Sequence, residues 1–422
     1  MKAITFAAPI PRYLTTRAAR GISEALAVGV HACTRFQTVA APDLPGDQWV
    51  RIRTRLGGIC GSDLGIVALD ASPSTSPFSS FPFVLGHENV GVIAELGRAV
   101  RGWAVGERVT VNPLLCCEPR AVSPPCEACA RGEHSRCVHF TDGALPPGML
   151  IGTTRSLGGS WGEEFVAHRS QLVRVAEQTT DAEAVLVEPF ACCVHAVRAG
   201  VPGPRERVFV IGAGTMGLLT TAALRALAPE TPVTVLARHA FQARHAGRLG
   251  AARVVLARGD YLGELADAAH TRLLAPIVGR PVGVGGFDRT YVCANGARGV
   301  EDALRFTRAG GTIVLLANVT MLRRVDWTPL WLKELTLRGT LAYGGPVHGG
   351  ADEGAFVEAL RLIAGGRVPL GPLVTHRYPL AAYRRALATA RGRGAHESVK
   401  VVFDYGAEGK VRGAESTGRR ER

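Results

Sequence analysis

Hydrophobic and polar residues alternate along the first part of the chain in the way that is typical of half-buried strands. The clearest such runs are 49–55, 90–96 and 107–111. Two stretches instead predict loops, 71–80 because it is rich in Ser and Pro, and 113–139 because Pro and Cys crowd together there. We therefore expect the chain up to about residue 180 to be mostly β.

From about residue 181 the pattern changes to alternating helices and strands. A helix is expected to begin with Asp181 as its N-cap and to continue toward Gly200. Short apolar strands follow at 207–212, 233–236, 253–256, 289–293 and 311–316, with helices such as 215–228 between the earlier ones. This alternation predicts an α/β fold with a doubly wound parallel sheet. Beyond about residue 340 the pattern is mixed again and ends in a strand at 398–403.

The composition of the 422-residue chain, 47% hydrophobic and 20% charged, excludes wholesale disorder. No apolar run reaches the roughly 18 residues that span a bilayer, and the N-terminus has no signal-peptide pattern. The net charge is +13, but the basic residues are spread along the chain without a nucleic-acid-binding module. We expect a cytoplasmic enzyme with no nucleic-acid or membrane partner and a modest attraction for anionic ligands.

A glycine-rich turn directly follows the first strand of the alternating region. The sequence Gly212-Ala-Gly214-Thr215-Met216-Gly217 has the Gly-x-Gly-x-x-Gly spacing between a strand and a helix. The first glycine permits a tight turn, the second lets a pyrophosphate approach the backbone, and the third lets helix and strand pack closely. We interpret these six residues as a dinucleotide-binding turn. The alternative is an ordinary strand–helix turn.

The end of the next strand indicates which dinucleotide binds. An NAD site usually has Asp or Glu there, about 20 residues further on, to hold the ribose 2′-hydroxyl. This chain has Ala237-Arg238-His239 and no acid. The Arg238 guanidinium suits a 2′-phosphate, which favours NADP over NAD. The alternative is that Arg238 is a solvated residue at the start of a helix.

Candidate ligands for a catalytic metal lie in two short motifs. Gly-Ile-Cys60-Gly-Ser62-Asp63 and Leu-Gly-His87-Glu88 together supply a thiolate, an imidazole and a carboxylate, the ligand types of a zinc that keeps one position open. Asp63 is a candidate to orient the His87 ring, and Ser62 to pass a proton. Each of these residues taken alone is more often structural.

One acidic residue and a group of cysteines complete the candidate sites. Glu188 lies in an apolar stretch, where a carboxylate is costly unless it is paired or metal-bound; an ordinary helix residue is the alternative. Five of the ten cysteines fall between residues 116 and 137, which indicates a second metal site. Three thiolates of a structural zinc site would come from Cys126, Cys129 and Cys137, and the fourth from Cys116 or Cys117. Free or disulfide-bonded cysteines are the alternative.

In this order, the motifs resemble the zinc-dependent medium-chain dehydrogenase (alcohol dehydrogenase) family, in its threonine/sorbitol dehydrogenase-like branch. The resemblance covers roughly residues 45 to 405, and the stretches 158–165 and Glu188-Pro189 add to it. It implies a mostly-β GroES-like catalytic domain, built from both ends of the chain, and a central Rossmann domain. The expected ranges are 1–180 and 341–406 for the catalytic domain, 181–340 for the cofactor domain and 407–422 for a disordered tail.

The resemblance also implies hydride transfer between NAD(P) and an alcohol or carbonyl substrate. The catalytic zinc would be held by Cys60, His87 and Glu88, with Glu188 as a further or exchanging ligand. The family implies a homodimer or homotetramer. The alternatives are a zinc-free C=C reductase of the same fold and a non-catalytic NADP-binding sensor.

This chain departs from the family's pattern at two positions. The structural zinc loop commonly begins with a cysteine where Ser123 stands here, so Cys117, in preference to Cys116, is expected to replace it. Many members have a histidine five residues after the catalytic cysteine; here that position is Gly65, so a proton relay must end elsewhere. Segments near 62–66, 81–83 and 153–162 are expected to line the substrate pocket. The long segment 12–45 either caps that pocket or is a surface insertion.

Overall fold

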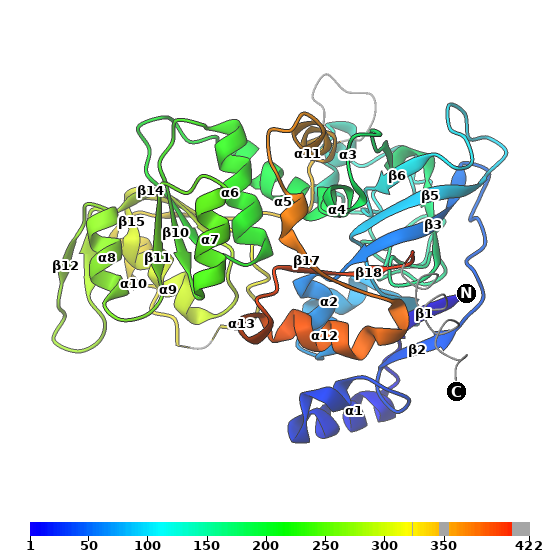
Figure 1. Ribbon diagram of the computed structural model, residues 1–422, viewed down its shortest axis with the longest axis horizontal. Coiled ribbons are helices and arrows are strands. Elements are labelled where there is room, and N and C mark those ends of the chain that lie inside the picture. Colours follow the sequence, from blue (N-terminus) through cyan, green and yellow to red (C-terminus); the bar gives the residue numbers. More distant parts are fainter. Residues whose placement is uncertain (323, 346–353, 407–422) are drawn as a thin grey trace, which may run out of the picture. The chain divides into compact units, whose positions relative to one another are not determined.

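The computed structural model, shown in Figure 1, describes residues 1–322, 324–345 and 354–406. The chain forms two compact units. The first consists of Met1–Glu188, Gly344–Leu360 and the chain from Leu370 on, and the second of Pro189–Tyr343 and Arg361–Pro369. The N-terminal and C-terminal parts of the described chain therefore both contribute to the first unit. The sequence pattern placed these boundaries at 180/181 and 340/341, and the expected tail 407–422 lies outside the described residues.

The first unit is built on two sheets (Figure 1). The smaller has the order β2-β1-β4, and the larger the order β17-β18-β3-β5-β6-β8, with β7 also paired to β3. The strands of the smaller sheet are β1 (Lys2–Phe6), β2 (Thr34–Thr38) and β4 (Phe83–Val84). Those of the larger sheet are β3 (Trp49–Gly58), β5 (Asn89–Leu96), β6 (Arg108–Val111), β7 (Glu164–His168), β8 (Leu172–Arg174), β17 (Val374–Tyr378) and β18 (Lys400–Asp404).

The alternation that predicted strands in this region corresponds to alternating burial. In β3, Ile52 and Leu56 are buried in the core, while Arg53 and Arg55, which lie between them in the sequence, are exposed. The predictions of strands at 49–55, 90–96 and 107–111 are confirmed by β3, β5 and β6. β3 pairs with three other strands, β5, β7 and β18. Its C-terminal end therefore lies inside the unit, next to the candidate metal ligands.

Helices interrupt the part of the chain that was expected to be mostly β. The helices of the first unit are α1 (Ile10–Ile22), α2 (Gly61–Val67), α3 (Glu127–Ala130), α4 (Asp181–Ala184), α12 (Tyr383–Arg391) and α13 (Arg393–His396). Two more, α5 (Val187–Arg198) and α11 (Ala355–Ala364), cross the boundary between the units. The helix expected from 181 to 200 is thus two helices. Its N-cap is Thr180 rather than Asp181, because Thr180 and Glu183 exchange hydrogen bonds as a capping box.

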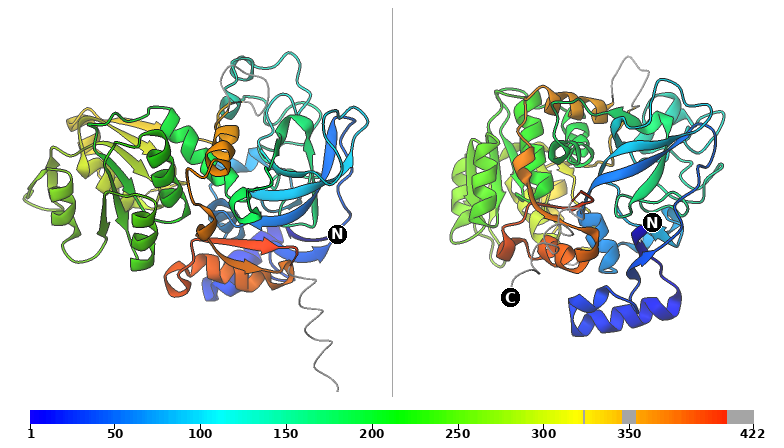
Figure 2. Two further views of the ribbon diagram at one scale, coloured as in Figure 1. Left: turned by 45° about the horizontal axis from the view of Figure 1, so that its top comes forward. Right: turned by 45° about the vertical axis from the view of Figure 1, so that its right-hand side comes forward.

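The second unit has a six-stranded sheet with the order β11-β10-β9-β14-β15-β16, and every neighbouring pair is parallel. This is the order of the Rossmann fold. Figure 2 shows the sheet with its helices from two sides. The strands are β9 (Val208–Ile211), β10 (Val233–Ala237), β11 (Arg253–Leu256), β14 (Phe287–Val292), β15 (Thr307–Leu315) and β16 (Thr336–Gly339). The helices are α6 (Thr215–Leu227), α7 (Ala240–Arg248), α8 (Tyr261–Ala268), α9 (Ala297–Phe306) and α10 (Thr328–Leu332).

The predicted doubly wound sheet is confirmed, with two local differences. β14 and β15 begin before the predicted strands at 289–293 and 311–316, and a short hairpin, β12 (Arg272–Leu274) and β13 (Val282–Val284), was not predicted. α8 and α9 pack over one face of the sheet, where Phe209 and Ile211 belong to the same hydrophobic core. None of the helices in the described ranges has the length and apolar character required to cross a membrane.

Candidate active site

The turn between β3 and α2 positions Cys60 and Asp63. β3 ends at Gly58, and α2 begins at the residue after Cys60. The backbone N–H of Cys60 donates to Asp63 Oδ2 at 3.0 Å, as an acid three residues after an N-cap does. Asp63 is fully buried. This hydrogen bond fixes its carboxylate, and the second oxygen, Oδ1, faces His87.

His87 lies between β4 and β5 and is 6% exposed. Its Nδ1 lies 3.4 Å from Asp63 Oδ1. Burial lowers the pKa of His87, but the charge of Asp63 and the neighbouring Cys60 raise it by more, so that this pKa lies well above its usual value. The structure therefore brings Cys60, Asp63 and His87 together. With Nδ1 directed at Asp63, Nε2 is the ring nitrogen available to a metal.

Glu88 makes a buried ion pair with Lys400 of β18. Lys400 Nζ lies 2.6 Å from each Glu88 carboxylate oxygen and also donates to the Ile59 carbonyl at 3.2 Å. Glu88 is 0% and Lys400 2% exposed. Gly58 is required here, since a Cβ at this position would lie 2.0 Å from Glu88 Oε2. A metal that took Glu88 as a ligand would therefore have to share its carboxylate with Lys400.

Two cations of this site, Lys400 and Arg393, were not predicted from the sequence. Lys400 is one of only four lysines in the chain. Its position as a charged residue within an apolar strand is the sequence feature that could have pointed to a buried partner. Arg393, the first residue of α13, is close enough to Cys60 and Glu88 for their charges to act on it. Burial lowers the pKa of Arg393, and those two charges oppose this effect. Lys400 therefore pairs with Glu88, and the Arg393 guanidinium is a second positive charge that acts on the same group of residues.

The remaining predicted catalytic residues occupy helix starts. Ser62 is half-buried at the second position of α2, and Gly65 lies on the next turn of the same helix. Glu188 is 4% exposed in the first turn of α5. Its burial agrees with the argument that this carboxylate needs a partner. Its membership of a metal site stays a prediction.

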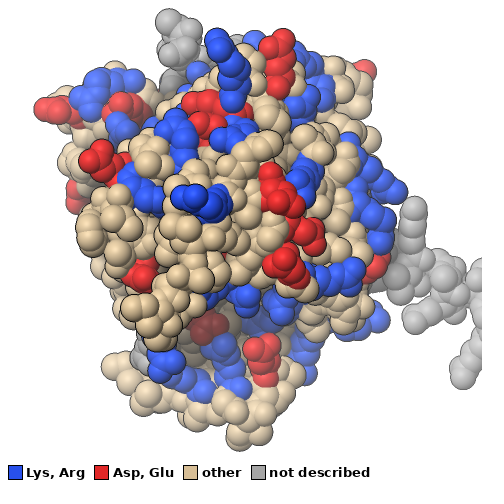
Figure 3. Space-filling view, turned by 90° about the vertical axis from the view of Figure 1, so that its left-hand side faces the viewer, with Lys and Arg blue, Asp and Glu red and all other residues tan. Residues whose placement is uncertain are grey.

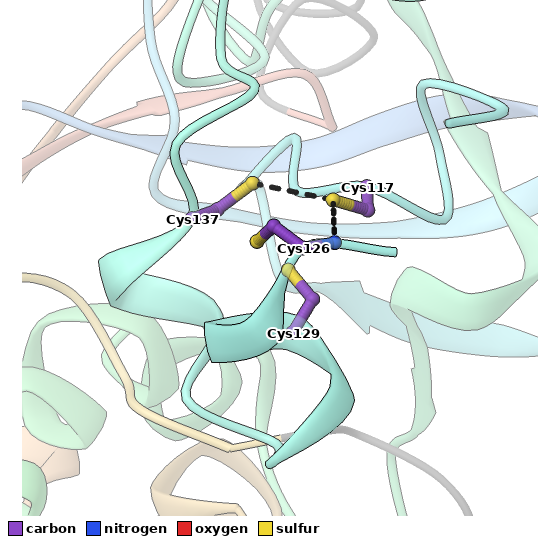
Figure 4. A group of neighbouring side chains, drawn as sticks. All are labelled: Cys117, Cys126, Cys129 and Cys137. Atoms are coloured by element: carbon purple, nitrogen blue, oxygen red, sulfur yellow. Dashed lines mark hydrogen bonds between the residues drawn. The ribbon is translucent and has the colours of Figure 1, made fainter. Parts of the chain in front are cut away.

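Four cysteines of the Pro-rich loop form a cluster, which Figure 4 shows. The sulfur atoms of Cys117, Cys126, Cys129 and Cys137 all lie within 4.8 Å of one another. Cys117 Sγ is 3.6 Å from Cys137 Sγ and accepts a hydrogen bond from the Cys126 backbone N–H at 3.4 Å. Among the described residues, no other group of three or more His, Cys, Asp or Glu side chains has its potential metal-ligating atoms this close together. The donors predicted for the catalytic metal are spaced more widely.

Cys117, not Cys116, belongs to this cluster, as the sequence analysis preferred. Cys116 neighbours Cys129 but lines a separate cavity of about 380 Å³. Burial acts to raise the pKa of Cys126, but backbone N–H groups lower it to about 6, whereas burial raises the pKa of Cys117 to about 11. Four sulfurs at these separations fit the donor set that a structural zinc requires.

A buried arginine that the sequence did not single out organises the same loop. Arg120 is 0% exposed. Its guanidinium donates to the carbonyls of Asp142 at 2.8 Å, Pro146 at 2.8 Å and Leu145 at 3.3 Å. These hydrogen bonds hold residues 142–146 against the loop segment that contains Cys117 and Arg120. Because its partners lie more than 20 residues away, local sequence patterns gave no signal for this role.

The predicted dinucleotide turn connects β9 to α6. Gly212 has a φ of +94°, and a Cβ on Gly217 would lie 1.7 Å from the Gly212 carbonyl oxygen. Gly214 is the N-cap of α6, so the first N–H groups of the helix are open to an anion. Thr215 is buried, and the Met216 carbonyl accepts from Thr220 Oγ1 at 2.8 Å. The turn therefore has the backbone shape that a pyrophosphate requires.

Arg238 directly follows β10 and is exposed. Its backbone N–H lies 3.3 Å from the side-chain oxygen of Gln242. The neighbouring parallel strand β11 is followed by a second exposed arginine, Arg258, at the same edge of the sheet. The sequence analysis missed Arg258, because only the strand order places it beside Arg238.

Both units match known protein families. Residues 46–177 match the model described as "Alcohol dehydrogenase GroES-like domain", and residues 215–364 match that of "Zinc-binding dehydrogenase". The chain is 30% identical over 346 residues to "Probable D-xylulose reductase A" of Arthroderma otae, covering 81% of this chain and 86% of that protein. The chain belongs to the zinc-dependent alcohol dehydrogenase family. This alcohol dehydrogenase is accordingly an oxidoreductase that acts on an alcohol or carbonyl substrate with zinc and a nicotinamide cofactor.

Other relatives agree with this assignment. The alcohol dehydrogenase is 26% identical over 383 residues to the sorbitol dehydrogenase of Arabidopsis thaliana, which covers 89% of this chain and 93% of the relative. Among solved structures, a zinc-binding dehydrogenase from Sinorhizobium meliloti, bound to NADP, matches with a TM-score of 0.68 and 26% identity over 88% of this chain and 96% of that one. The GroES-like and Rossmann folds are thereby confirmed. The relatives favour the alcohol dehydrogenase over the zinc-free reductase and the sensor.

Proposed function

We propose that this alcohol dehydrogenase oxidises a secondary hydroxyl of a polyol or sugar acid to the ketone, reversibly and with NADP. The observation that carries the proposal is the triad formed by Cys60 and Asp63, at the start of α2, and His87, which faces Asp63 from the segment between β4 and β5. Support for the substrate class comes from the relatives, whose names include sorbitol dehydrogenase, xylulose reductase and L-idonate 5-dehydrogenase. A panel of polyols and sugar acids, assayed for NADP reduction, tests it.

The donor set at this triad fits a zinc ion. Cys60 would supply a thiolate, and His87 would supply Nε2, because its Nδ1 faces the buried Asp63. Glu88 and Glu188 are the candidate carboxylate ligands. When bound, zinc supplies Lewis-acid stabilisation of negative charge on the substrate oxygen. We propose Glu88 and Glu188 as alternating ligands, because Lys400 already engages both oxygens of Glu88.

The chain's own residues position the reactants and handle the proton. Asp63 keeps the His87 ring and the Cys60 backbone in place. Ser62 accepts the proton of the substrate hydroxyl and passes it to water, since Gly65 has no side chain to continue a relay. A nicotinamide held at the Gly212–Gly217 turn would supply the hydride acceptor, and the balance would be one ketone, one reduced cofactor and one proton for each alcohol.

The cofactor proposal is NADP. The Gly212–Gly217 turn fits a pyrophosphate, because a Cβ at Gly217 would collide with the turn. Arg238 follows β10, at the sequence position where an NAD site usually has an acid, and Arg258 follows the neighbouring strand β11 at the same edge of the sheet; both support a 2′-phosphate. Measuring kcat/KM with NADP and NAD tests this, and a preference for NAD of more than about tenfold, or 1.4 kcal/mol, would contradict it.

We further propose a cytoplasmic homodimer that joins through the edge of the Rossmann sheet. β16 is the last strand of that sheet, and within the described ranges it pairs only with β15. Exposed apolar side chains flank it: Trp331 is 71% and Leu332 58% exposed. An unprotected edge strand with apolar neighbours favours pairing with another chain. Sedimentation of wild type and Trp331→Glu tests this, and an unchanged dimer would contradict it.

A further inference from the structure

The first helix, α1, is held firmly on the first unit by its inner face. Thr16 is 2% exposed, and its hydroxyl oxygen accepts from the Cys33 backbone N–H at 3.1 Å. Arg20 makes two hydrogen bonds to the Asp70 carboxylate, at 2.6 and 2.7 Å. Tyr13 packs against the hydrophobic core of this unit. The helix is therefore fixed in orientation, and its outer face is presented in one direction.

That outer face is apolar. Ile10, Leu14 and Ile22 are 76%, 59% and 85% exposed, and the exposed Ala18 lies between them. Positions 10, 14, 18 and 22 are four residues apart, so they form one stripe along the helix. Two more apolar residues of the next segment, Leu26 and Val30, are 48% and 75% exposed. Large apolar side chains exposed in one stripe indicate a surface that another body covers.

The charged residues around this stripe have one dominant sign. Within α1 the charged residues are Arg12, Arg17 and Arg20, with no acid. A fourth arginine, Arg384 of α12, lies next to Gly29 of the segment that follows α1, where a Cβ would be 2.9 Å from its guanidinium. The acidic charges that act on Arg20 are those of Asp70, its ion-pair partner, and Glu24. Figure 3 shows this region at the bottom of the view, with an uncharged tip and mostly blue side chains above it.

We propose that α1 docks this enzyme on an anionic lipid surface, with its apolar stripe at the level of the headgroups. A basic rim around an apolar helix face is the arrangement of interfacial helices, and the net charge of +13 attracts the whole chain to such a surface. A second copy would bring the same arginines against each other, so the charges disfavour self-association through this face. The helix of 13 residues lies on the bilayer and does not cross it.

This inference is independent of the catalytic proposal and departs from the expectation, made from the sequence, that the chain has no membrane partner. It also assigns a role to the first part of the segment 12–45, which was expected to be either a pocket cap or a surface insertion. That expectation of no membrane partner was based only on the absence of an apolar run long enough to span a bilayer. The exposure of the stripe became visible only when the structure showed which face of the helix packs on the first unit.

The experiment is co-sedimentation of the full-length enzyme with vesicles of phosphatidylcholine alone or mixed with phosphatidylglycerol. We expect binding to the mixed vesicles only, and loss of that binding at high salt. Leu14→Glu and Arg17→Glu should each weaken it by about tenfold or more. Val105→Glu is the matched control, because Val105 is 62% exposed on a loop of the same unit, and it should bind as wild type does.

Circular dichroism and unfolding midpoints establish that the variants are folded. Three outcomes overturn the proposal. The first is no binding to either kind of vesicle. The second is equal binding by wild type and Leu14→Glu. The third is a dimer in analytical ultracentrifugation that Leu14→Glu dissociates, which assigns the stripe to a second copy of this chain.

Discussion

The Lys400 ammonium lies 2.6 Å from both oxygens of the Glu88 carboxylate, and both groups are removed from solvent. The pair joins β18, near the end of the described chain, to the stretch that carries His87. Because a buried charge without its partner is costly, we expect Lys400→Met to lower the free energy of unfolding by about 3–5 kcal/mol.

Urea unfolding measures this prediction. The double variant Glu88→Gln/Lys400→Met removes both charges and should recover most of the loss. A loss below about 1 kcal/mol in the single variant would show that the pair is not the structural link described here.

Asp63 is expected to act on the metal through His87. Asp63→Asn keeps the size of the side chain but removes the charge that faces Nδ1 at 3.4 Å. We expect zinc affinity or kcat/KM to fall by about 10–100-fold. Metal content and kcat/KM, measured together, check this. Asp70→Asn is the matched control on the same unit and should keep both; normal values in Asp63→Asn would contradict the assignment.

Cys116 and Cys117 are adjacent but are predicted to differ in function. Cys117→Ser removes one donor of the four-sulfur cluster and should lose the structural zinc and lower the unfolding temperature. Cys116→Ser should keep the metal, because this residue lies outside the cluster. Zinc content of the two purified variants decides between them, and the opposite pattern would assign the fourth ligand to Cys116.

Arg238 should carry the preference for the phosphorylated cofactor. A charge-assisted hydrogen bond to a phosphate contributes about 1.5–3 kcal/mol, so Arg238→Asp should lower kcat/KM with NADP by about 10–100-fold and leave NAD nearly unchanged. Arg253→Asp, at the opposite end of β11, is the control. Equal effects on both cofactors would remove Arg238 from the 2′-phosphate site.

Acidification should destabilise the first unit through His168. Burial lowers the pKa of His168 from 6.5 to about 4. Below pH 6.5 the unfolded chain takes up a proton that the folded chain does not, so this stability is lost as the pH falls toward 4. The loss should be about 2 kcal/mol between roughly pH 7 and 5. His168→Gln should show a correspondingly flatter pH dependence in urea unfolding.

The sequence predicted those features whose determinants lie close together along the chain. The Gly212–Gly217 turn, the motif around Cys60 and the spacing of Cys126, Cys129 and Cys137 are local, because one turn or loop contains them. The alternation of apolar and polar residues likewise predicted β3, since every second residue of a half-buried strand faces the core.

The features that were missed depend on contacts between distant segments. Lys400 meets Glu88 across 312 residues, and Arg120 holds carbonyls more than 20 residues away. Arg258 lies beside Arg238 because β10 and β11 are neighbours in the sheet. α1 was missed because its exposed apolar stripe does not follow the usual rule that the apolar face of a helix is buried.

The most direct test of the central claim is zinc content and NADP-linked alcohol oxidation, measured side by side for wild type and Cys60→Ala. We predict about two zinc ions per wild-type chain, and about one, with turnover abolished, in Cys60→Ala. A folded Cys60→Ala variant that kept both ions or full turnover would contradict the assignment of Cys60 to the catalytic metal.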